Sequence, residues 1–183
     1  RDLRMSRGLG DVYKRQEFSH VVDIIAQAKH IYIVGFRSSS FLAGYLNFYF
    51  RLIYDNVTQV QGGAAGTFDQ LFRVGPGDVV IAICFPRYSE LALKTVQYAK
   101  DRGATIIGVT DSEMSPVYQM SSGSLLVRNE MISFVDSLAA PMSMLNALIL
   151  AAAHKQGTDI SATFNELEHV WDRFGIFGKV EGE

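Results

Sequence analysis

Two short segments of this sequence combine serine hydroxyls with an arginine guanidinium. The first segment is Gly35-Phe36-Arg37-Ser38-Ser39-Ser40, and the second is Cys84-Phe85-Pro86-Arg87-Tyr88-Ser89. A hydroxyl donates one hydrogen bond, and a guanidinium donates a charge-assisted pair of them. This is chemistry that suits the oxygens of a phosphate group, so both segments are candidate anion-binding loops.

Both segments lie where a buried strand is expected to end and a helix to begin. The runs 31–34 and 79–84 are short, apolar and rich in β-branched residues, which is typical of buried strands. The first N–H groups of a helix lack intrahelical acceptors and carry partial positive charge, so they also attract anions. Two alternatives need no ligand: the serines only cap the helices, and Arg87 is a solvated charge beside a turn shaped by Pro86.

The rest of the chain alternates between segments with the apolar spacing of a helix and short runs typical of strands. Helical spacing of apolar residues predicts helices over 18–28, 41–53, 67–72, 90–102, 115–120, 133–156 and 160–174. Short apolar runs predict strands over 31–34, 56–60, 79–84, 105–109 and 124–127. This order predicts an α/β protein with a three-layer doubly wound fold, in which helices flank a five-stranded parallel sheet. Ligands of such sheets bind beyond the carboxyl ends of the strands.

The first sixteen residues differ in pattern from the rest of the chain. The run from Met5 to Gln16 has no apolar periodicity and resembles translated adapter sequence. We interpret residues 1–16 as a non-native or disordered segment, with a flexible native arm as the alternative. Residues 17–183 are then one domain.

Composition excludes several classes. The formal net charge is −2 and the pI is near 6.1, which is not the basic footprint of a nucleic-acid-binding domain. Cys84 is the only cysteine, so an intrachain disulfide is impossible and a reducing compartment is expected. The longest apolar stretch, 138–153, is too short and too polar to span a membrane. We expect a cytoplasmic globular protein.

Three segments resemble a known family. The run 31–41, the loop Phe85-Pro86-Arg87-Tyr88-Ser89 and the run 137–148 are similar to the C-terminal sugar isomerase (SIS) domain of RpiR-type transcriptional regulators. The resemblance extends over about residues 18–174. The Phe-Pro-Arg-Tyr-Ser loop is its most specific part.

The resemblance implies a five-stranded parallel sheet that binds a sugar phosphate at the two loops. It implies an N-terminal helix-turn-helix domain through which the full-length protein binds DNA, and a homodimer or homotetramer. The residues themselves show no metal-ligand spacing, and we expect no cofactor and no metal. Together with the loop chemistry, the resemblance gives the expected ligand-binding residues: Gly35, Arg37, Ser38, Ser39, Ser40, Cys84, Arg87 and Ser89.

The sequence also departs from the family pattern. Arg37 stands where many members have glycine, and Cys84 stands where the enzymes usually have serine, which removes a good hydrogen-bond donor. Pro86-Arg87-Tyr88 replaces the Ser-Gly-x of isomerases and amidotransferases. The segment before Glu17 contains no helix-turn-helix.

Aldose–ketose isomerisation needs a general base, and the sequence offers Glu90, Glu130, His154 and His169 without a compelling arrangement. We therefore predict a ligand sensor and not an enzyme. An isomerase and a pure assembly module remain alternatives. The long helix from Ser133 is expected either to meet a second copy through Met142, Met144 and Leu148 or to pack inside its own domain.

Overall fold

The computed structural model describes residues 2–128, 131–132, 135–157 and 160–177. Five strands form one sheet in the order β2-β1-β3-β4-β5, and every pair in it is parallel. The strands are β1 (Ile31–Val34), β2 (Val57–Val60), β3 (Val79–Ile83), β4 (Thr105–Thr110) and β5 (Gly123–Leu126). The predicted five-stranded parallel sheet is confirmed. Its order reverses between β1 and β3, which is the switch point where ligands of such sheets bind.

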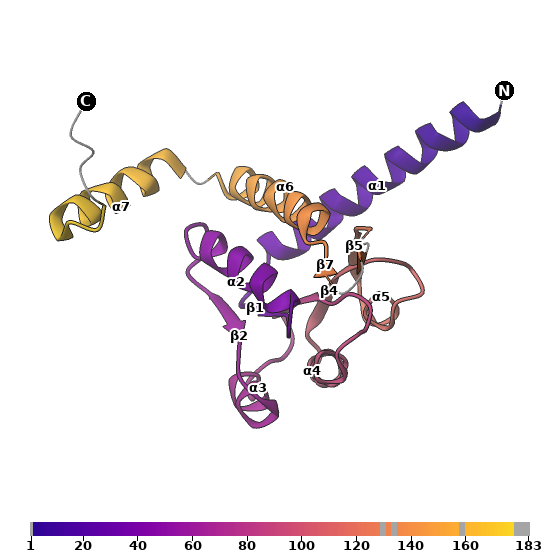
Figure 1. The fold of residues 1–183 in the computed structure, drawn as a ribbon, viewed down its shortest axis with the longest axis horizontal. Helices are drawn as coiled ribbons and strands as arrows, with labels where there is room; N and C mark the ends of the chain where they lie inside the picture. The colour runs from indigo at the N-terminus through magenta and orange to yellow at the C-terminus, as the bar shows by residue number, and fades with distance from the viewer. Residues whose placement is uncertain (1, 129–130, 133–134, 158–159, 178–183) are drawn as a thin grey trace.

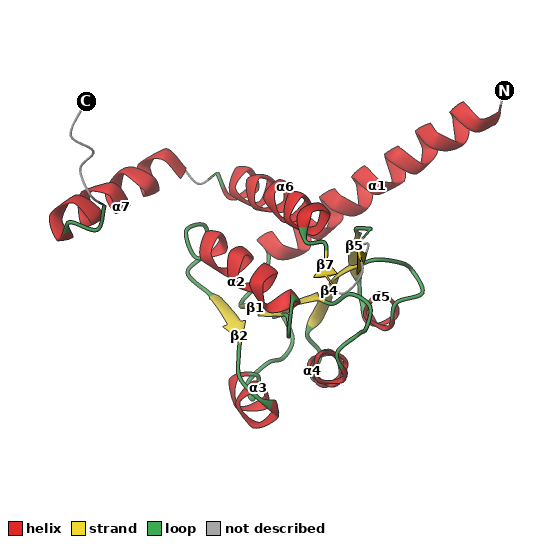
Figure 2. Ribbon diagram, in the orientation of Figure 1, coloured by secondary structure: helices red, strands yellow, loops and turns green. Residues whose placement is uncertain are grey.

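Helices cover both faces of the sheet. Figures 1 and 2 show α1, α2 and α6 on one side and α3, α4 and α5 on the other, which gives the predicted three layers. The helices are α1 (Asp2–Ala26), α2 (Ser39–Phe50), α3 (Ala64–Gln70), α4 (Glu90–Asp101), α5 (Pro116–Met120), α6 (Ala139–Gln156) and α7 (Ile160–Phe174). A two-stranded antiparallel hairpin of β6 (Met131–Ile132) and β7 (Val135–Asp136) leads into α6.

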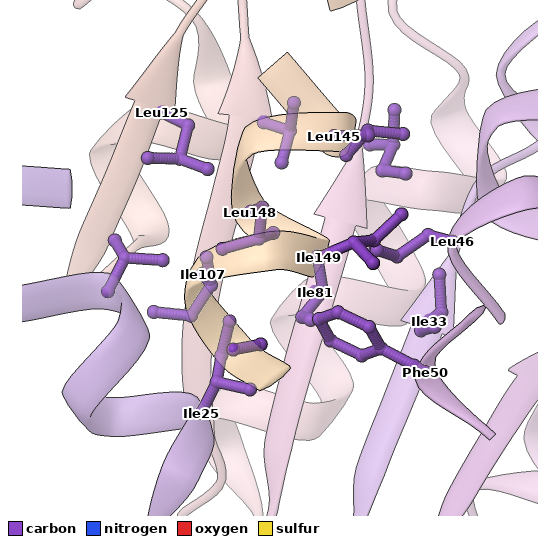
Figure 3. Close-up of a cluster of buried hydrophobic side chains, with 14 of the residues drawn as sticks. Ile25, Ile33, Leu46, Phe50, Ile81, Ile107, Leu125, Leu145, Leu148 and Ile149 are labelled. Atoms are coloured by element: carbon purple, nitrogen blue, oxygen red, sulfur yellow. The ribbon is translucent and has the colours of Figure 1, made fainter. Parts of the chain in front are cut away.

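The layers are held together by two apolar clusters, one on each face of the sheet. Successive strand residues point to opposite faces, so Ile33 joins the α1–α2–α6 cluster while Val34 joins the α3–α4–α5 cluster. Figure 3 shows the first cluster, in which Phe50 of α2 and Leu148 of α6 pack over the sheet. Each fully buried side chain of this kind contributes about 1.5–3 kcal/mol. A well-packed sheet therefore gives the strand ends fixed positions.

The long helix is expected from the sequence either to meet a second copy or to pack inside its own domain. The structure decides between these two interpretations at Leu148. Leu148 is fully buried in the core, so the suggestion that it meets a second copy is wrong. Met142 and Met144 are half-buried and also pack against this core. The periodic apolar stripe of α6 is thus used inside the domain. No helix in the described part of the chain is long and apolar enough to cross a membrane.

The starts of three helices differ most from the predictions. Residues 2–16 are helical and continue into the predicted helix, whereas the sequence pattern predicts an irregular arm; whether they are native stays a prediction. The helix near residue 67 begins at Ala64. The long helix begins at Ala139 and not at Ser133, because Val135 and Asp136 pair with β6 instead. Pro141 then lies in the first turn, where a missing N–H costs no intrahelical hydrogen bond.

Candidate functional site

A pocket of about 410 Å³ lies at the carboxyl ends of β1 and β3. Six of the eight predicted ligand-binding residues line it, and a further polar side chain, Asp136, comes from β7. The six are Arg37, Ser38, Ser39, Cys84, Arg87 and Ser89. The structure thus brings both candidate loops to one pocket at the switch point of the sheet. Gly35 and Ser40 are not among the lining residues.

Gly35 shapes the pocket without lining it. A Cβ atom at this position would lie 2.6 Å from the Ser39 carbonyl oxygen and 3.0 Å from the Ala43 Cβ. Real Cβ atoms do not approach backbone so closely, so only glycine lets α2 begin this near to the end of β1. The position of the α2 N-terminus over the pocket therefore depends on Gly35.

Arg37 has a backbone conformation that favours glycine. Its φ is +57°, the only positive φ of a non-glycine residue in the part of the chain that the structure describes. A side chain in this left-handed region costs free energy that glycine would not. This strain is a physical reason why glycine suits position 37. The arginine found here instead has an exposed side chain that lines the pocket.

The three serines of the first loop have different partners. The Ser38 hydroxyl donates to Asp136 Oδ2 at 2.7 Å, across 98 positions of sequence. The Ser40 hydroxyl donates to the Arg37 carbonyl oxygen at 2.6 Å, so it stabilises the loop and does not face the pocket. Ser39 is 7% exposed, lines the pocket, and its hydroxyl has no hydrogen-bond partner among the described residues. Ser39 is therefore the donor of this loop that is free for a ligand.

The second loop is fixed by two hydrogen bonds. The Ser89 hydroxyl oxygen accepts a hydrogen bond from the Ala92 N–H at 3.4 Å and so caps α4, which the capping alternative for the serines expects. Its own O–H hydrogen is not used in this bond. The Tyr88 hydroxyl donates to Asp111 Oδ1 at 2.8 Å, and burial together with this bond raises the pKa of Tyr88 to about 12. Tyr88 therefore anchors the loop as a neutral phenol.

Cys84 ends β3 as a buried side chain. It is 3% exposed, and burial raises the pKa of its thiol above the ordinary value of 9.0, although a backbone hydrogen bond with Ser89 opposes this shift. A neutral buried thiol is a weak nucleophile and a weak donor. Cys84 therefore suits packing at the pocket wall better than nucleophilic attack.

The charges around the pocket are unbalanced. Neither Arg37 nor Arg87 forms an ion pair with a carboxylate among the described residues. The N-termini of α2 and α4 both begin at the loops that line the pocket and add partial positive charge. Within the described part of the chain, Asp136 is the only carboxylate that lines this pocket. The site thus attracts an anion while it holds one acidic group.

Three of the four bases considered from the sequence lie in the described part of the chain, and none of the three lines this pocket. Glu90 is exposed and pairs with Lys94 at 3.5 Å, and His154 and His169 are exposed on α6 and α7. Glu130 lies outside the described residues. Where the structure is described, no group of three or more histidines, cysteines or carboxylates could hold a metal ion.

Sequence reasoning missed Asp136. It precedes a segment that the sequence already links to the family, but it lies in a stretch that helical spacing assigns to the long helix. An acidic residue just before a helix is common, so its type alone carries no signal. Only the hydrogen bond to Ser38 and its place in the pocket identify it.

The comparison with protein families finds one match. The model of the SIS domain matches residues 24–151, which include both loops and most of α6. Curated proteins give no match.

Solved structures share the fold at low identity. The sugar isomerase domain of an RpiR transcription factor from Sphaerobacter thermophilus is 19% identical and has a TM-score of 0.79, over 92% of this chain and 99% of that one. The Vibrio vulnificus NanR protein complexed with ManNAc-6P is 15% identical with a TM-score of 0.76, over 90% of this chain and 62% of NanR. A Methanococcus jannaschii protein, inferred to be a 3-hexulose-6-phosphate isomerase, is 14% identical with a TM-score of 0.57, over 84% of this chain and 79% of that one.

Proposed function

This chain belongs to the SIS domain family, and from that premise we propose that it is the phosphosugar-binding effector domain of an RpiR-type transcriptional regulator. The observation that carries the proposal is the pocket at the switch point. Two loops from different parts of the chain supply guanidinium groups without ion pairs among the described residues, hydroxyl hydrogens and two helix N-termini to one cavity. This combination suits a phosphate ester, and about 410 Å³ is room for a sugar as well.

In this proposal the phosphate binds at the start of α2. The Ser39 residue is largely buried but lines the pocket, and its hydroxyl has no partner within the described residues, so it donates to a phosphate oxygen. The N–H groups of Ser40 and Phe41 already donate to the carbonyl oxygens of Arg37 and Ser38, so the α2 N-terminus adds mainly the partial positive charge of its dipole. Arg37 and Arg87 neutralise charge from the exposed side, and Ser89 donates to the phosphate or to a sugar hydroxyl.

The neighbours support the regulator interpretation. The RpiR domain matches almost all of this chain, and NanR is complexed with ManNAc-6P. We propose that the full-length protein binds DNA through an N-terminal helix-turn-helix domain, acts in the cytoplasm and is a homodimer or homotetramer. The ligand then shifts DNA affinity to the extent that it binds one arrangement of the subunits more tightly than another.

Proton and phosphorus NMR test the proposal. Hexose, pentose and amino-sugar phosphates are mixed one by one with the protein, and the line widths of the ligand signals are followed over time. A sensor broadens the lines of at least one ligand and produces no new signals. The proposal is abandoned if no phosphosugar in the panel shows broadened lines at millimolar concentration.

The same experiment addresses the isomerase alternative. Asp136 favours this alternative, because it is a carboxylate in the pocket and a carboxylate can act as a general base. The likeness to the M. jannaschii protein is a second reason to keep it. New sugar signals that grow with time, and that disappear in Asp136→Asn, would replace the sensor by an isomerase.

A further inference from the structure

The position of Asp136 poses a physical problem for a phosphate pocket. A carboxylate repels a phosphate dianion, and this repulsion is larger in a half-buried site than in water. The other charged features of the pocket favour anions: two guanidinium groups and two helix N-termini. A site that only had to hold phosphate would bind it better without this side chain.

The structure holds Asp136 in place. Its Oδ2 atom accepts the Ser38 hydroxyl hydrogen at 2.7 Å, and its backbone belongs to β7, which pairs with β6. Its Oδ1 atom has no hydrogen-bond partner among the described residues, although the side chain lines the pocket. A fixed carboxylate with one unused oxygen is an acceptor for a donor group that the ligand itself brings.

A sugar phosphate brings such a donor, whereas inorganic phosphate has no donor outside the group that carries its charge. A sugar hydroxyl, or the ammonium of an amino sugar, would satisfy Oδ1 and offset the repulsion. The carboxylate therefore penalises a bare anion more than an anion that carries a separate donor group. Selectivity of this kind arises from a repulsive element as well as from an attractive one.

We propose that Asp136 is a specificity residue: it accepts a hydrogen bond from a hydroxyl or ammonium group of the sugar, and so makes the pocket discriminate against inorganic phosphate. The inference rests on the proposed function, since it assumes that the pocket binds a sugar phosphate. It assigns two neighbouring groups of the pocket, at the start of α2, to different parts of one ligand. Ser39 and the start of α2 take the phosphate, and Asp136 takes the sugar.

The test is a ratio of two dissociation constants. Calorimetry gives the dissociation constants of four ligands for the wild type, Asp136→Asn and Asp136→Ala. The ligands are inorganic phosphate, glucose 6-phosphate, glucosamine 6-phosphate and the sugar phosphate of the NMR panel that binds most tightly. We expect both variants to bind inorganic phosphate severalfold more tightly. We expect Asp136→Ala to bind the sugar phosphate more weakly, so that its preference for sugar phosphate over inorganic phosphate falls at least tenfold.

Asp136→Asn, which removes the negative charge, distinguishes the two possible sugar donors, a hydroxyl and an ammonium group. Asparagine keeps a neutral acceptor, so Asp136→Asn retains a hydroxyl partner, whereas an ammonium partner loses its opposite charge. A large loss of glucosamine 6-phosphate affinity in Asp136→Asn, with little loss of glucose 6-phosphate affinity, identifies an ammonium. Similar small losses for both identify a hydroxyl.

Two further variants keep the result interpretable. Asp69→Asn makes the same charge change on exposed α3, away from the pocket, and should leave every constant unchanged. Ser38→Ala breaks the bond to Asp136 but leaves the carboxylate, so it should still prefer sugar phosphate. The inference is overturned if Asp136→Ala changes the affinities for inorganic phosphate and sugar phosphate by the same factor. Failure of the wild type to bind any sugar phosphate would instead overturn the proposed function.

Discussion

The two loops that line the pocket have similar residues but are built differently. Both end a buried strand, carry an arginine and open a helix. In the second loop, Ser89 uses its oxygen to cap α4, which satisfies the Ala92 N–H within the protein. In the first loop, Ser38 occupies the cap position of α2 but forms no side-chain cap bond, since its hydroxyl donates to Asp136. The helix α2 is left without a side-chain cap for its first N–H groups.

This difference suggests that the second loop serves mainly the stability of the fold and the first loop mainly ligand binding. The second loop stabilises the fold by itself, because its serine caps a helix whether or not a ligand is present. The first loop is strained at Arg37 and leaves the pocket-lining Ser39 hydroxyl without a partner among the described residues. Features that lower the stability of the protein and have no structural role are expected at functional sites. The first loop is therefore the better candidate for the phosphate.

The largest effect is expected at Gly35. In Gly35→Ala the new Cβ would meet the Ser39 carbonyl oxygen at 2.6 Å, so α2 must shift away from the pocket. We expect a loss of about 1–3 kcal/mol in the free energy of unfolding and at least a tenfold loss of phosphosugar affinity. Denaturant melts and calorimetry measure the two quantities.

Gly44→Ala is the matched control for Gly35. A Cβ at Gly44, inside α2, would touch only the Gln59 side chain at 3.7 Å, which is ordinary contact. It should raise stability by up to about 1 kcal/mol, because alanine is the better helix former, and leave affinity unchanged. Equal behaviour of the two variants would contradict the role assigned to Gly35.

The two serines should separate binding from stability. Ser39→Ala removes a donor to a charged ligand, so affinity falls roughly tenfold to a hundredfold while stability stays the same. Ser89→Ala removes a helix cap, so the free energy of unfolding falls by about 1 kcal/mol and affinity falls less. If Ser39→Ala lost stability and kept affinity, the comparison of the loops would be reversed.

Arg37 should show opposite changes in stability and affinity. Arg37→Gly relieves about 1–2 kcal/mol of left-handed strain. The greater entropy of the unfolded chain opposes this gain by about 0.4–1 kcal/mol, so stability rises by up to about 1.5 kcal/mol. Affinity falls severalfold, and more at low salt than at high salt, because the guanidinium is exposed. Arg37→Ala should lose affinity equally without the gain in stability, and a gain in both variants would argue against strain at this position.

The smallest effect is expected at Cys84, above neutral pH. The folded protein raises the pKa of this thiol above 9.0, so folding disfavours the thiolate. The stability from the neutral thiol is complete below pH 9 and is lost as the pH rises through the folded pKa. Above about pH 9, the free energy of unfolding should fall more steeply in the wild type than in Cys84→Ser. Parallel curves would mean that the thiol titrates normally.

The sequence predicts the scaffold better than the contacts within the site. Four of the five strands follow from apolar runs such as 79–84, because a strand buried on both faces has a composition that few other elements share. The segment 56–60 gives only a weak strand signal, and its strand β2 is only partly buried. Six of the eight predicted site residues line one pocket, because parallel strands bring their carboxyl ends to one edge of the sheet. Chemistry and position together are enough to identify the loops.

What the sequence could not predict depends on contacts between distant positions. Ser38 and Ser40 share a residue type with Ser39, and only the structure shows that their hydroxyls have partners within the protein. Asp136 comes from a hairpin that breaks the helical pattern, and its partner lies 98 positions away. Gly35 is needed for a close approach of backbone, which no local pattern encodes.

Amide NMR of the ¹⁵N-labelled protein tests the central claim most directly. The tightest phosphosugar of the panel is titrated into the wild type, and the shifts of the backbone amides are mapped onto the structure. We predict that the largest shifts fall in 37–41 and 85–92, with a smaller shift at Asp136, and that Ser39→Ala abolishes them at the same ligand concentration. Saturable shifts that lie elsewhere, for example between α1 and β5, would contradict the account.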